Sequence, residues 1–211
     1  MVVFEFCAEN LTLLDKAIAA GASRIELCDN LAVGGTTPSI GVIKEALKLT
    51  REKSVDLCVI IRPRGGDFVY TDLEVQAMLA DIRAAKEIGV TCFVLGALSG
   101  DRKLDQRVMQ LLLAACGEAE VVFHMAFDEL AHTDQLEAIE WLSIHGVARI
   151  LTRAGGLDAT LEQRFEHYHR LLAAAKGKIQ ILPGGGVTVE NRALFLEQLG
   201  VCQLHGTRIV F

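Results

Sequence analysis

Eight short apolar runs recur along this 211-residue sequence, and each of the first seven is followed by apolar residues at helical spacing. Short, largely apolar runs of this kind are typical of strands buried on both faces of a parallel sheet. We predict strands at residues 2–7, 24–28, 57–61, 92–95, 120–123, 148–151, 179–182 and 201–205. Thr71 and Glu74 have capping-box spacing and predict the start of the third helix, and helices are expected at residues 158–175 and 188–199 after the sixth and seventh runs. Eight strand–helix units are the number that closes into a (β/α)8 barrel of the TIM type.

Polar residues stand at or near the ends of these runs, and this favours a barrel over an open, doubly wound sheet. They are Glu5, Glu26, Arg62, His124, Thr152 and His205. In a barrel the carboxyl ends of all strands surround one mouth, whereas an open sheet has only one or two switch points. We therefore expect a shared site at the mouth of a barrel.

The composition indicates one domain over residues 1–211. Hydrophobic residues make up 51% of the sequence and only three prolines occur, so we expect a sizeable core without a linker. A net charge of −6 argues against nucleic acid and anionic membranes as partners, because both need a positive field. Neither a signal peptide nor a membrane span is indicated, which predicts a cytoplasmic protein whose six cysteines are reduced.

Two arginines interrupt this acidic background directly after the third run. Arg62 and Arg64 lie in a loop with Gly65 and Gly66, at the edge where α/β proteins place their ligands. We interpret Arg62 and Arg64 as binding groups for a small anion. The alternative is that they are solvated turn residues beside glycines that supply positive φ.

The first two runs share a pattern in which glutamate and cysteine are two residues apart. Glu5 precedes Cys7 and Glu26 precedes Cys28, so that each pair faces one side of the sheet. Strands about 4.8 Å apart would bring both thiols and both carboxylates together if the two patterns lie at one level. Two thiolates suit Cu(I) or Zn(II), with the glutamates as bases or as anchors for Arg62.

The alternative for these four residues is structural: the cysteines are small buried hydrophobes and the glutamates are paired inside the barrel. The remaining cysteines are expected to be inert. They are Cys58, Cys92, Cys116 and Cys202.

Two further groups follow later strands. His124 ends the fifth run, and Asp128 lies in the next loop. The histidine could serve as a general base, as a ligand or as a hydrogen-bond donor to an anion. The alternative is a buried histidine whose hydrogen bonds are satisfied within the protein. The glycines Gly184, Gly185 and Gly186 follow the seventh run, where many barrels hold a phosphate on backbone N–H groups. A plain tight turn is the alternative there. No organic cofactor is indicated.

Four motifs carry a resemblance to a known family. They are Glu26-Leu27-Cys28, residues 34–41 (Gly-Gly-Thr-Thr-Pro-Ser-Ile-Gly), residues 61–68 (Ile-Arg-Pro-Arg-Gly-Gly-Asp-Phe) and residues 123–128 (Phe-His-Met-Ala-Phe-Asp). The sequence resembles the CutC family, known as copper homeostasis proteins, from the first strand to the eighth. The resemblance implies a cytoplasmic (β/α)8 barrel with a role in copper handling, and Cu(I) at Cys7 and Cys28.

The sequence departs from the family pattern at Met125, where the motif usually has arginine. The methionine removes a cation that an anionic ligand would need and provides a thioether, a soft ligand, in its place. Arg153, in a loop that also differs, is a candidate to restore the charge. The abundance of charged groups supports a rival hypothesis, an uncharacterised enzyme acting on a small anionic or phosphorylated metabolite. Its acid–base candidates are Glu5, Glu26, His124 and Asp128.

Only residues 206–211 follow the eighth run, so no eighth helix is expected. The outer faces of the first and last strands would then lack their usual cover, and exposed apolar patches of several hundred Å² are uncommon on monomers. We therefore expect a homo-oligomer, most simply a two-fold dimer.

Overall fold

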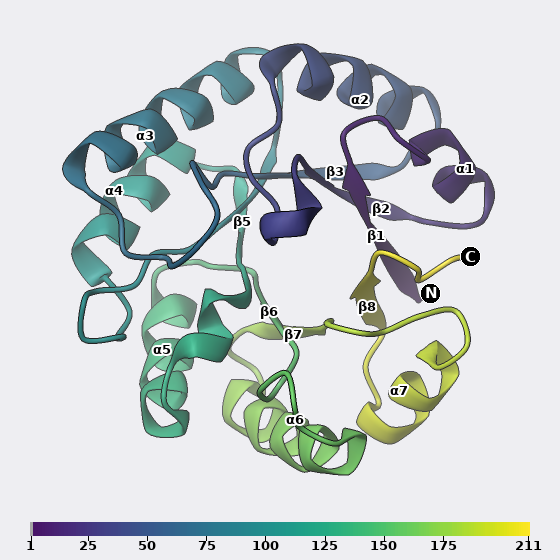
Figure 1. Ribbon diagram of the computed structural model, residues 1–211, viewed down its shortest axis with the longest axis vertical. Helices are drawn as coiled ribbons and strands as arrows, with labels where there is room; N and C mark the ends of the chain where they lie inside the picture. The colour runs from purple at the N-terminus through teal and green to yellow at the C-terminus, as the bar shows by residue number, and fades with distance from the viewer. Residues whose placement is uncertain (1) are drawn as a thin grey trace.

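The computed structural model describes residues 2–211, in which strands and helices alternate around a central barrel (Figure 1). Eight parallel strands form one sheet in the order β7-β6-β5-β4-β3-β2-β1-β8. Their bounds are β1 Val3–Glu9, β2 Arg24–Cys28, β3 Asp56–Ile60, β4 Cys92–Leu95, β5 Glu120–Phe123, β6 Arg149–Thr152, β7 Gln180–Pro183 and β8 Gln203–Gly206.

The first strand pairs with both β2 and β8, so the sheet curls into a ring rather than fanning out from a switch point. The ring closes between β7 and β8 through side chains, where Gln203 donates a hydrogen bond of 2.7 Å to Gln180. The predicted TIM-type barrel is confirmed. The alternative of a doubly wound sheet is wrong, because the strands follow one another in sequence order and the first pairs with the last, whereas a doubly wound sheet reverses its strand order at a switch point.

Within residues 2–211, seven α-helices cover the outside of the barrel (Figure 1). Their bounds are α1 Leu14–Ala19, α2 Ile40–Glu52, α3 Asp72–Glu87, α4 Gln106–Cys116, α5 His132–Ile144, α6 Leu161–Ala175 and α7 Arg192–Leu199. The start of α3 is the capping box that the sequence predicts, with Thr71 and Glu74 satisfying each other's backbone N–H. Helix α6 begins later than predicted because Thr160 caps it in the same way.

The strands bury side chains on both faces, in two separate layers. The outward-facing layer packs under the helices and contains large side chains such as Phe93 and Phe123. The inward-facing layer fills the barrel and is small and sulfur-rich: it contains Cys7, Cys28, Cys58 and Cys92 with Ile60, Val94, Val122, Leu151 and Leu182. Four of the six cysteines therefore line the barrel interior, where strand periodicity places every second side chain.

The described chain has no helix after β8, in agreement with the prediction. Instead, Ile209 and Val210 are buried, and Phe211 packs on Phe6 of β1 with ring centroids 5.4 Å apart. Lys16 of α1 lies over the Phe211 ring at 4.4 Å. These residues cover part of the face beside β1, and the homo-oligomer stays a prediction. No helix within residues 2–211 is long and apolar enough to cross a membrane.

Candidate functional site at the barrel mouth

A cavity of about 250 Å³ opens at the carboxyl ends of the strands. Its polar walls come from five strands or the loops that follow them, and they include Cys7, Glu26, Arg62, His124 and His205, with Met125, Gly185 and Gly186 beside them. Glu5 and Thr152 do not line it, although the sequence placed them at the mouth. Glu5 lies two residues before Cys7 on the same inward face of β1 and is therefore deeper in the barrel.

The two thiols predicted to converge do so. The Sγ atoms of Cys7 and Cys28 lie 3.8 Å apart, and both side chains are buried. The two Glu-Cys patterns do not lie at one level, however, because β1 and β2 are offset by two residues and Cys7 pairs with Glu26. This offset is part of the stagger that a barrel needs in order to close.

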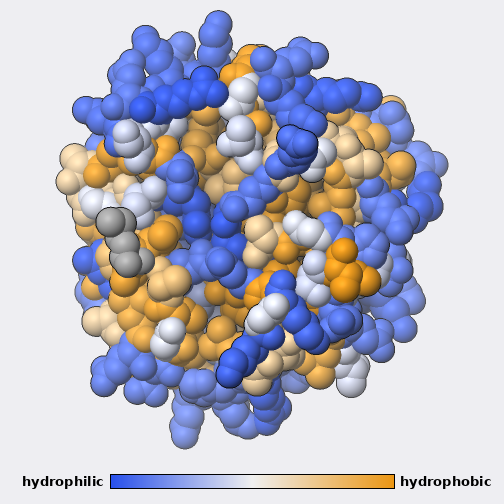
Figure 2. Space-filling view, turned by 180° about the vertical axis from the view of Figure 1, so that it is seen from behind, coloured by the Kyte–Doolittle hydropathy of each residue, from blue (hydrophilic) through white to orange (hydrophobic). Residues whose placement is uncertain are grey.

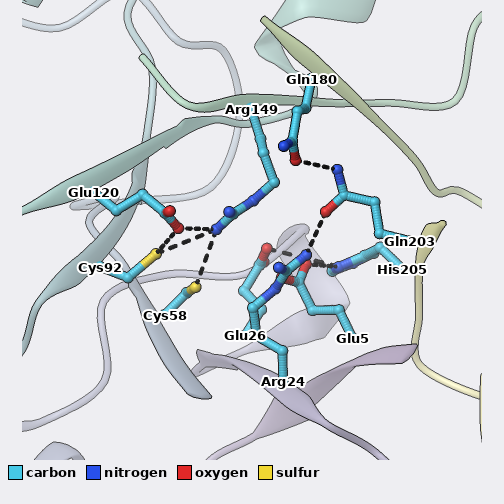
Figure 3. Close-up of polar contacts among 10 residues, drawn as sticks. All are labelled: Glu5, Arg24, Glu26, Cys58, Cys92, Glu120, Arg149, Gln180, Gln203 and His205. Atoms are coloured by element: carbon cyan, nitrogen blue, oxygen red, sulfur yellow. Dashed lines mark hydrogen bonds and ion pairs between the residues drawn. The ribbon is translucent and has the colours of Figure 1, made fainter. Parts of the chain in front are cut away.

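Because of this offset, the two glutamates have different partners. Glu5 forms a buried ion pair with Arg24 and accepts a 2.7 Å hydrogen bond from Nδ1 of His205 (Figure 3). Burial alone would raise the pKa of Glu5, but the bonds and charges of His205 and Arg24 outweigh it and lower the pKa to about 2. Glu5 is thus a fixed anion, and it pairs with Arg24 rather than Arg62.

Glu26 is in the opposite state. Burial raises its pKa to about 8, and the negative charges around Cys7 and Glu5 add to the effect against the attraction of His205. Its Oε1 accepts a 3.3 Å hydrogen bond from the Cys28 thiol. Its Oε2 is buried without a hydrogen-bond partner within residues 2–211 and lies 3.8 Å from Nδ1 of His205. At neutral pH Glu26 therefore carries a proton that it can release.

The thiol pair is polarised in the same way. A hydrogen bond from Cys28 lowers the pKa of Cys7 to about 6 against the opposing effect of burial, and His205 contributes to the lowering. The same bond and burial raise the pKa of Cys28 well above its usual range. Burial opposes the charged form of His205, but hydrogen bonds to Cys7 and Glu5 and their charges raise its pKa well above the usual range, and ionisation of Glu26 would raise it further. The site thus presents one thiolate, one thiol and one imidazolium at neutral pH.

The donor atoms of Cys7, Glu26 and His205 all lie within 4.8 Å of one another, which is compact enough for a shared metal ion. Sulfurs about 2.3 Å from one ion and 3.8 Å apart subtend an angle of roughly 110° at that ion. This angle fits three or four ligands rather than a linear pair of thiolates. The chemistry of the set, two sulfurs with an imidazole and a carboxyl group, suits a soft or borderline ion.

His124 reaches the cavity from the end of β5 and is neutral. Its Nδ1 accepts a hydrogen bond of 3.2 Å from the Ala126 N–H, which leaves the proton on Nε2. Burial and then the charge of Arg62 lower its pKa to about 3. Nε2 is buried without a partner within residues 2–211. His124 is therefore suited to donate a hydrogen bond and not to accept a proton at neutral pH.

The two arginines predicted to bind an anion are separated. Arg62 is buried at the mouth, where its guanidinium donates to the carbonyls of residues 33, 35 and 66 and ties two loops together. Its Nε has no partner within the described residues, and no carboxylate there lies within ion-pair distance. Arg64 lies outside the cavity, paired with Glu74 at the start of α3 and with Asp67.

The glycine loop contributes two of its three residues. Gly185 and Gly186 line the cavity and both have positive φ, 66° and 84°, so the loop is a tight turn as well as a wall of the site. Gly184 does not line it, and its carbonyl accepts hydrogen bonds from Arg164 and Tyr168 behind the strand.

Asp128 and Arg153 also lie away from the cavity lining. Asp128 is buried and accepts hydrogen bonds from the Thr152 hydroxyl at 2.5 Å and from the Arg153 N–H at 3.0 Å. Arg153 directs its Nε to within 3.9 Å of Asp128 and does not line the cavity. Arg153 therefore does not replace, at the cavity, the arginine that the family usually has at position 125. Met125 itself lines the cavity.

His205 was expected at the mouth but without a chemical role, and Arg24 was not expected there. His205 lies one residue before the end of β8 and pairs in register with Glu5, as the last inward residue of the last strand. Arg24 begins β2 on the same inward face as Glu26, so its parity in the strand was the signal there.

A TIM barrel whose mouth gathers two thiols, a carboxyl group and an imidazole defines a class of protein able to hold a thiophilic ion. The sequence profile of the CutC family matches residues 2–210. The chain belongs to the CutC family.

The relatives agree over nearly the whole chain. A CutC family protein of Enterococcus faecalis is 47% identical over 99% of this chain and 100% of its own length. A human protein named copper homeostasis protein cutC homolog is 40% identical over 96% of this chain and 72% of its own length.

Solved structures agree with the fold. A crystal structure of a CutC protein from Streptococcus agalactiae superposes with a TM-score of 0.95 at 46% identity and covers 99% of this chain and 100% of that one. A deoxyribose phosphate aldolase from Aeropyrum pernix has a TM-score of 0.69 at 13% identity, covers 97% of this chain and 85% of that chain, and shows the fold alone.

Proposed function

We propose that this protein binds Cu(I) at the barrel mouth through Cys7 and Cys28 and serves in copper homeostasis in the cytoplasm. The observation that carries the proposal is the 3.8 Å separation of the two sulfurs beneath the mouth cavity. The name of the human relative, a copper homeostasis protein cutC homolog, supports the same role. Soft thiolate ligands select Cu(I), and the reduced thiols that they require are stable in the cytoplasm.

The protonation states favour capture of a cation. Cys7 is already ionised near neutral pH, and the nearby Glu26 and Cys28 each hold a proton that a bound ion would displace. The angle of roughly 110° between the sulfurs calls for a third ligand. His205 and Glu26 are the groups within reach, and either must release its proton before it can bind the ion.

Replacing Cys7 or Cys28 with serine is expected to weaken Cu(I) binding by more than about 100-fold, because losing even an outer partner of a metal ligand costs roughly 10- to 100-fold. The measurement is a titration of the reduced protein with Cu(I) against a chromophoric chelator. Cys116→Ser is the matched control, since Cys116 is also buried but lies in α4 away from the mouth. Unchanged affinity in the Cys7→Ser/Cys28→Ser protein would refute the assignment.

A second candidate function, an enzyme or binding protein for a small anionic metabolite, is favoured by different atoms of the same cavity. The Nε2 of His124 and the Nε of Arg62 are buried hydrogen-bond donors without partners among residues 2–211. Arg62 lacks a carboxylate partner within residues 2–211, so its positive charge is available to an anion at the cavity. Glu26 is a buried group with a pKa near neutrality, as general acids and bases require.

Phosphorylated metabolites and inorganic phosphate are expected to raise the unfolding temperature of the protein if this candidate is right. A ligand at 100 times its Kd stabilises the folded state by about 2.7 kcal/mol. Arg62→Gln should abolish the shift, whereas Arg64→Gln, outside the cavity, should leave it intact. A screen without any shift, or a shift that survives Arg62→Gln, would exclude an anion at the mouth.

A further inference from the structure

A second group of sulfur and oxygen ligands lies at the opposite end of the barrel, where the strands begin. A cavity of about 370 Å³ opens there, lined by Cys58, Cys92, Glu120 and Arg149. Figure 2, which shows the molecule from behind, has hydrophilic residues gathered around the hollow centre of this face. None of these four residues takes part in the mouth site.

Cys58, Cys92 and Glu120 converge on one point. Their sulfur and carboxylate atoms all lie within 4.8 Å of one another, and the Cys92 thiol lies 3.5 Å from Oε1 of Glu120. Figure 3 shows the three side chains pointing toward one another from β3, β4 and β5. The thiols are buried, while the Glu120 side chain is 45% exposed and connects the group to solvent.

The point on which they converge is occupied by a cation of the protein itself. One terminal nitrogen of the Arg149 guanidinium lies 3.7 Å from the Cys58 sulfur and 3.6 Å from the Cys92 sulfur, and it also pairs with Glu120. A single nitrogen thus contacts all three ligand groups (Figure 3). The arrangement is that of a cation site in which an arginine provides the positive charge.

The stagger of the barrel explains why these ligands reach the base. In register, Cys7 pairs with Glu26, Glu26 with Cys58, and Cys92 with Glu120. This line of paired residues runs across strands tilted by about 36° and spaced about 4.8 Å apart, so it descends by about 3 Å at each strand. One line of ligand side chains therefore begins at the mouth and ends at the base.

We propose that Cys58, Cys92 and Glu120 form a second metal site, for a divalent ion of intermediate softness such as Zn(II), which displaces the Arg149 guanidinium from between them. Two sulfurs and one carboxylate oxygen are ligands that Zn(II) accepts, with a water from the cavity as the fourth. Both thiols lose their protons to solvent when the ion binds.

Charge balance selects a divalent ion. The two buried thiolates carry two negative charges, which a divalent ion neutralises, while the half-exposed Glu120 stays in contact with solvent. A monovalent ion would leave one buried negative charge uncompensated. Asp56 and Glu118, which also line the cavity, favour the approach of a cation from solvent.

The test uses the full chain with Cys7→Ser and Cys28→Ser, so that the mouth thiols are absent and the result is independent of the proposed copper site. The reduced, metal-free protein is titrated with Co(II), whose visible bands report tetrahedral thiolate coordination, and Zn(II) is then added to displace it. We expect about one Co(II) per chain. Adding Cys58→Ser or Cys92→Ser should abolish the thiolate spectrum, and adding Cys116→Ser should not.

Two further variants separate a metal site from a structural cluster. Glu120→Gln, at a half-exposed position, should weaken Zn(II) binding about tenfold, and Arg149→Gln should strengthen it about tenfold because it removes the competing cation. A structural role predicts no gain in affinity on losing Arg149. The proposal is overturned if the background protein shows no thiolate bands, if Cys58→Ser retains them, or if Arg149→Gln binds Zn(II) no more tightly.

Discussion

Arg24→Met is expected to lower the free energy of unfolding by about 3–5 kcal/mol, which is the usual cost of removing one partner from a buried ion pair. Arg24 is 6% exposed, and its guanidinium pairs with Glu5 and donates a 2.9 Å hydrogen bond to Gln203. Without Arg24, the charge of Glu5 stays buried with only His205 to compensate it. Urea unfolding at pH 7 measures the loss.

Two comparisons test the reason for this loss. Arg170→Met breaks a pair with Glu166 in which both side chains are more than half exposed, and we expect a change below about 1 kcal/mol. The Glu5→Gln/Arg24→Met protein should be more stable than Arg24→Met alone, because the unpaired charge is gone. If Arg24→Met were as stable as the wild type, His205 alone would be enough to compensate the buried charge of Glu5.

The barrel could be predicted from the sequence because its determinants are local. Each strand is a short apolar run and each helix has its own apolar stripe, so one unit can be recognised without knowing its neighbours. The capping box at Thr71 and Glu74 is equally local and was predicted correctly. The predicted start of α7 was wrong. The helix was expected from Thr188, but residues 188–191 form a turn in which Asn191 accepts a hydrogen bond from the Thr188 N–H, and α7 begins at Arg192.

The register between strands could not be predicted. The Glu-Cys patterns of β1 and β2 are identical in spacing, and this suggested one level, but closure of the barrel offsets them by two residues. Because of the offset, Glu5 forms its ion pair with Arg24, and Glu26 lies opposite Cys7 in the register. Stagger is a property of the whole ring, and no single strand specifies it.

The same limit explains which candidate residues lie together at the mouth. Cys7, Cys28, Glu26 and His124 were expected there from residue type and strand position, and they lie at the cavity or directly beneath it. Arg64 was included because it lies close to Arg62 in the sequence, yet the two have different surroundings. Arg62 donates to loop carbonyls at the mouth, whereas Arg64 pairs with Glu74 at the start of α3. Adjacent loop residues need not share a site, since the chain reverses within a turn.

The base cluster was missed for a related reason. Cys58 lies in the middle of β3 and Cys92 begins β4, whereas TIM barrels place their active sites at the carboxyl ends of the strands. Arg149 begins β6 and could be placed beside them only with the register known. Residues at the amino-terminal end of a barrel usually serve stability, and the displacement of Arg149 by Zn(II) distinguishes the two roles here.

Glu26→Gln is expected to change how stability depends on pH. In the folded protein burial raises the pKa of Glu26 from 4.5 to about 8, whereas in the unfolded chain the carboxyl group loses its proton near its ordinary value. The unfolded state therefore binds fewer protons between these values. The contribution of Glu26 to stability is complete below pH 4.5 and is lost as the pH rises toward 8, at up to about 1.4 kcal/mol per pH unit.

Glutamine cannot ionise and has nearly the shape of the protonated glutamate. The free energy of unfolding of the variant should therefore lack the part of the pH dependence that Glu26 contributes. Near pH 4.5 both proteins carry a neutral side chain at position 26 and should unfold at similar urea concentrations. Toward pH 8 the variant should become the more stable by several kcal/mol, as measured on metal-free, reduced protein across the range. If the free energies of unfolding of the two proteins ran parallel at all pH values, Glu26 would be ionised in the folded protein. Glu26 would then be a second fixed anion, like Glu5 deeper in the barrel, and would have no proton to release.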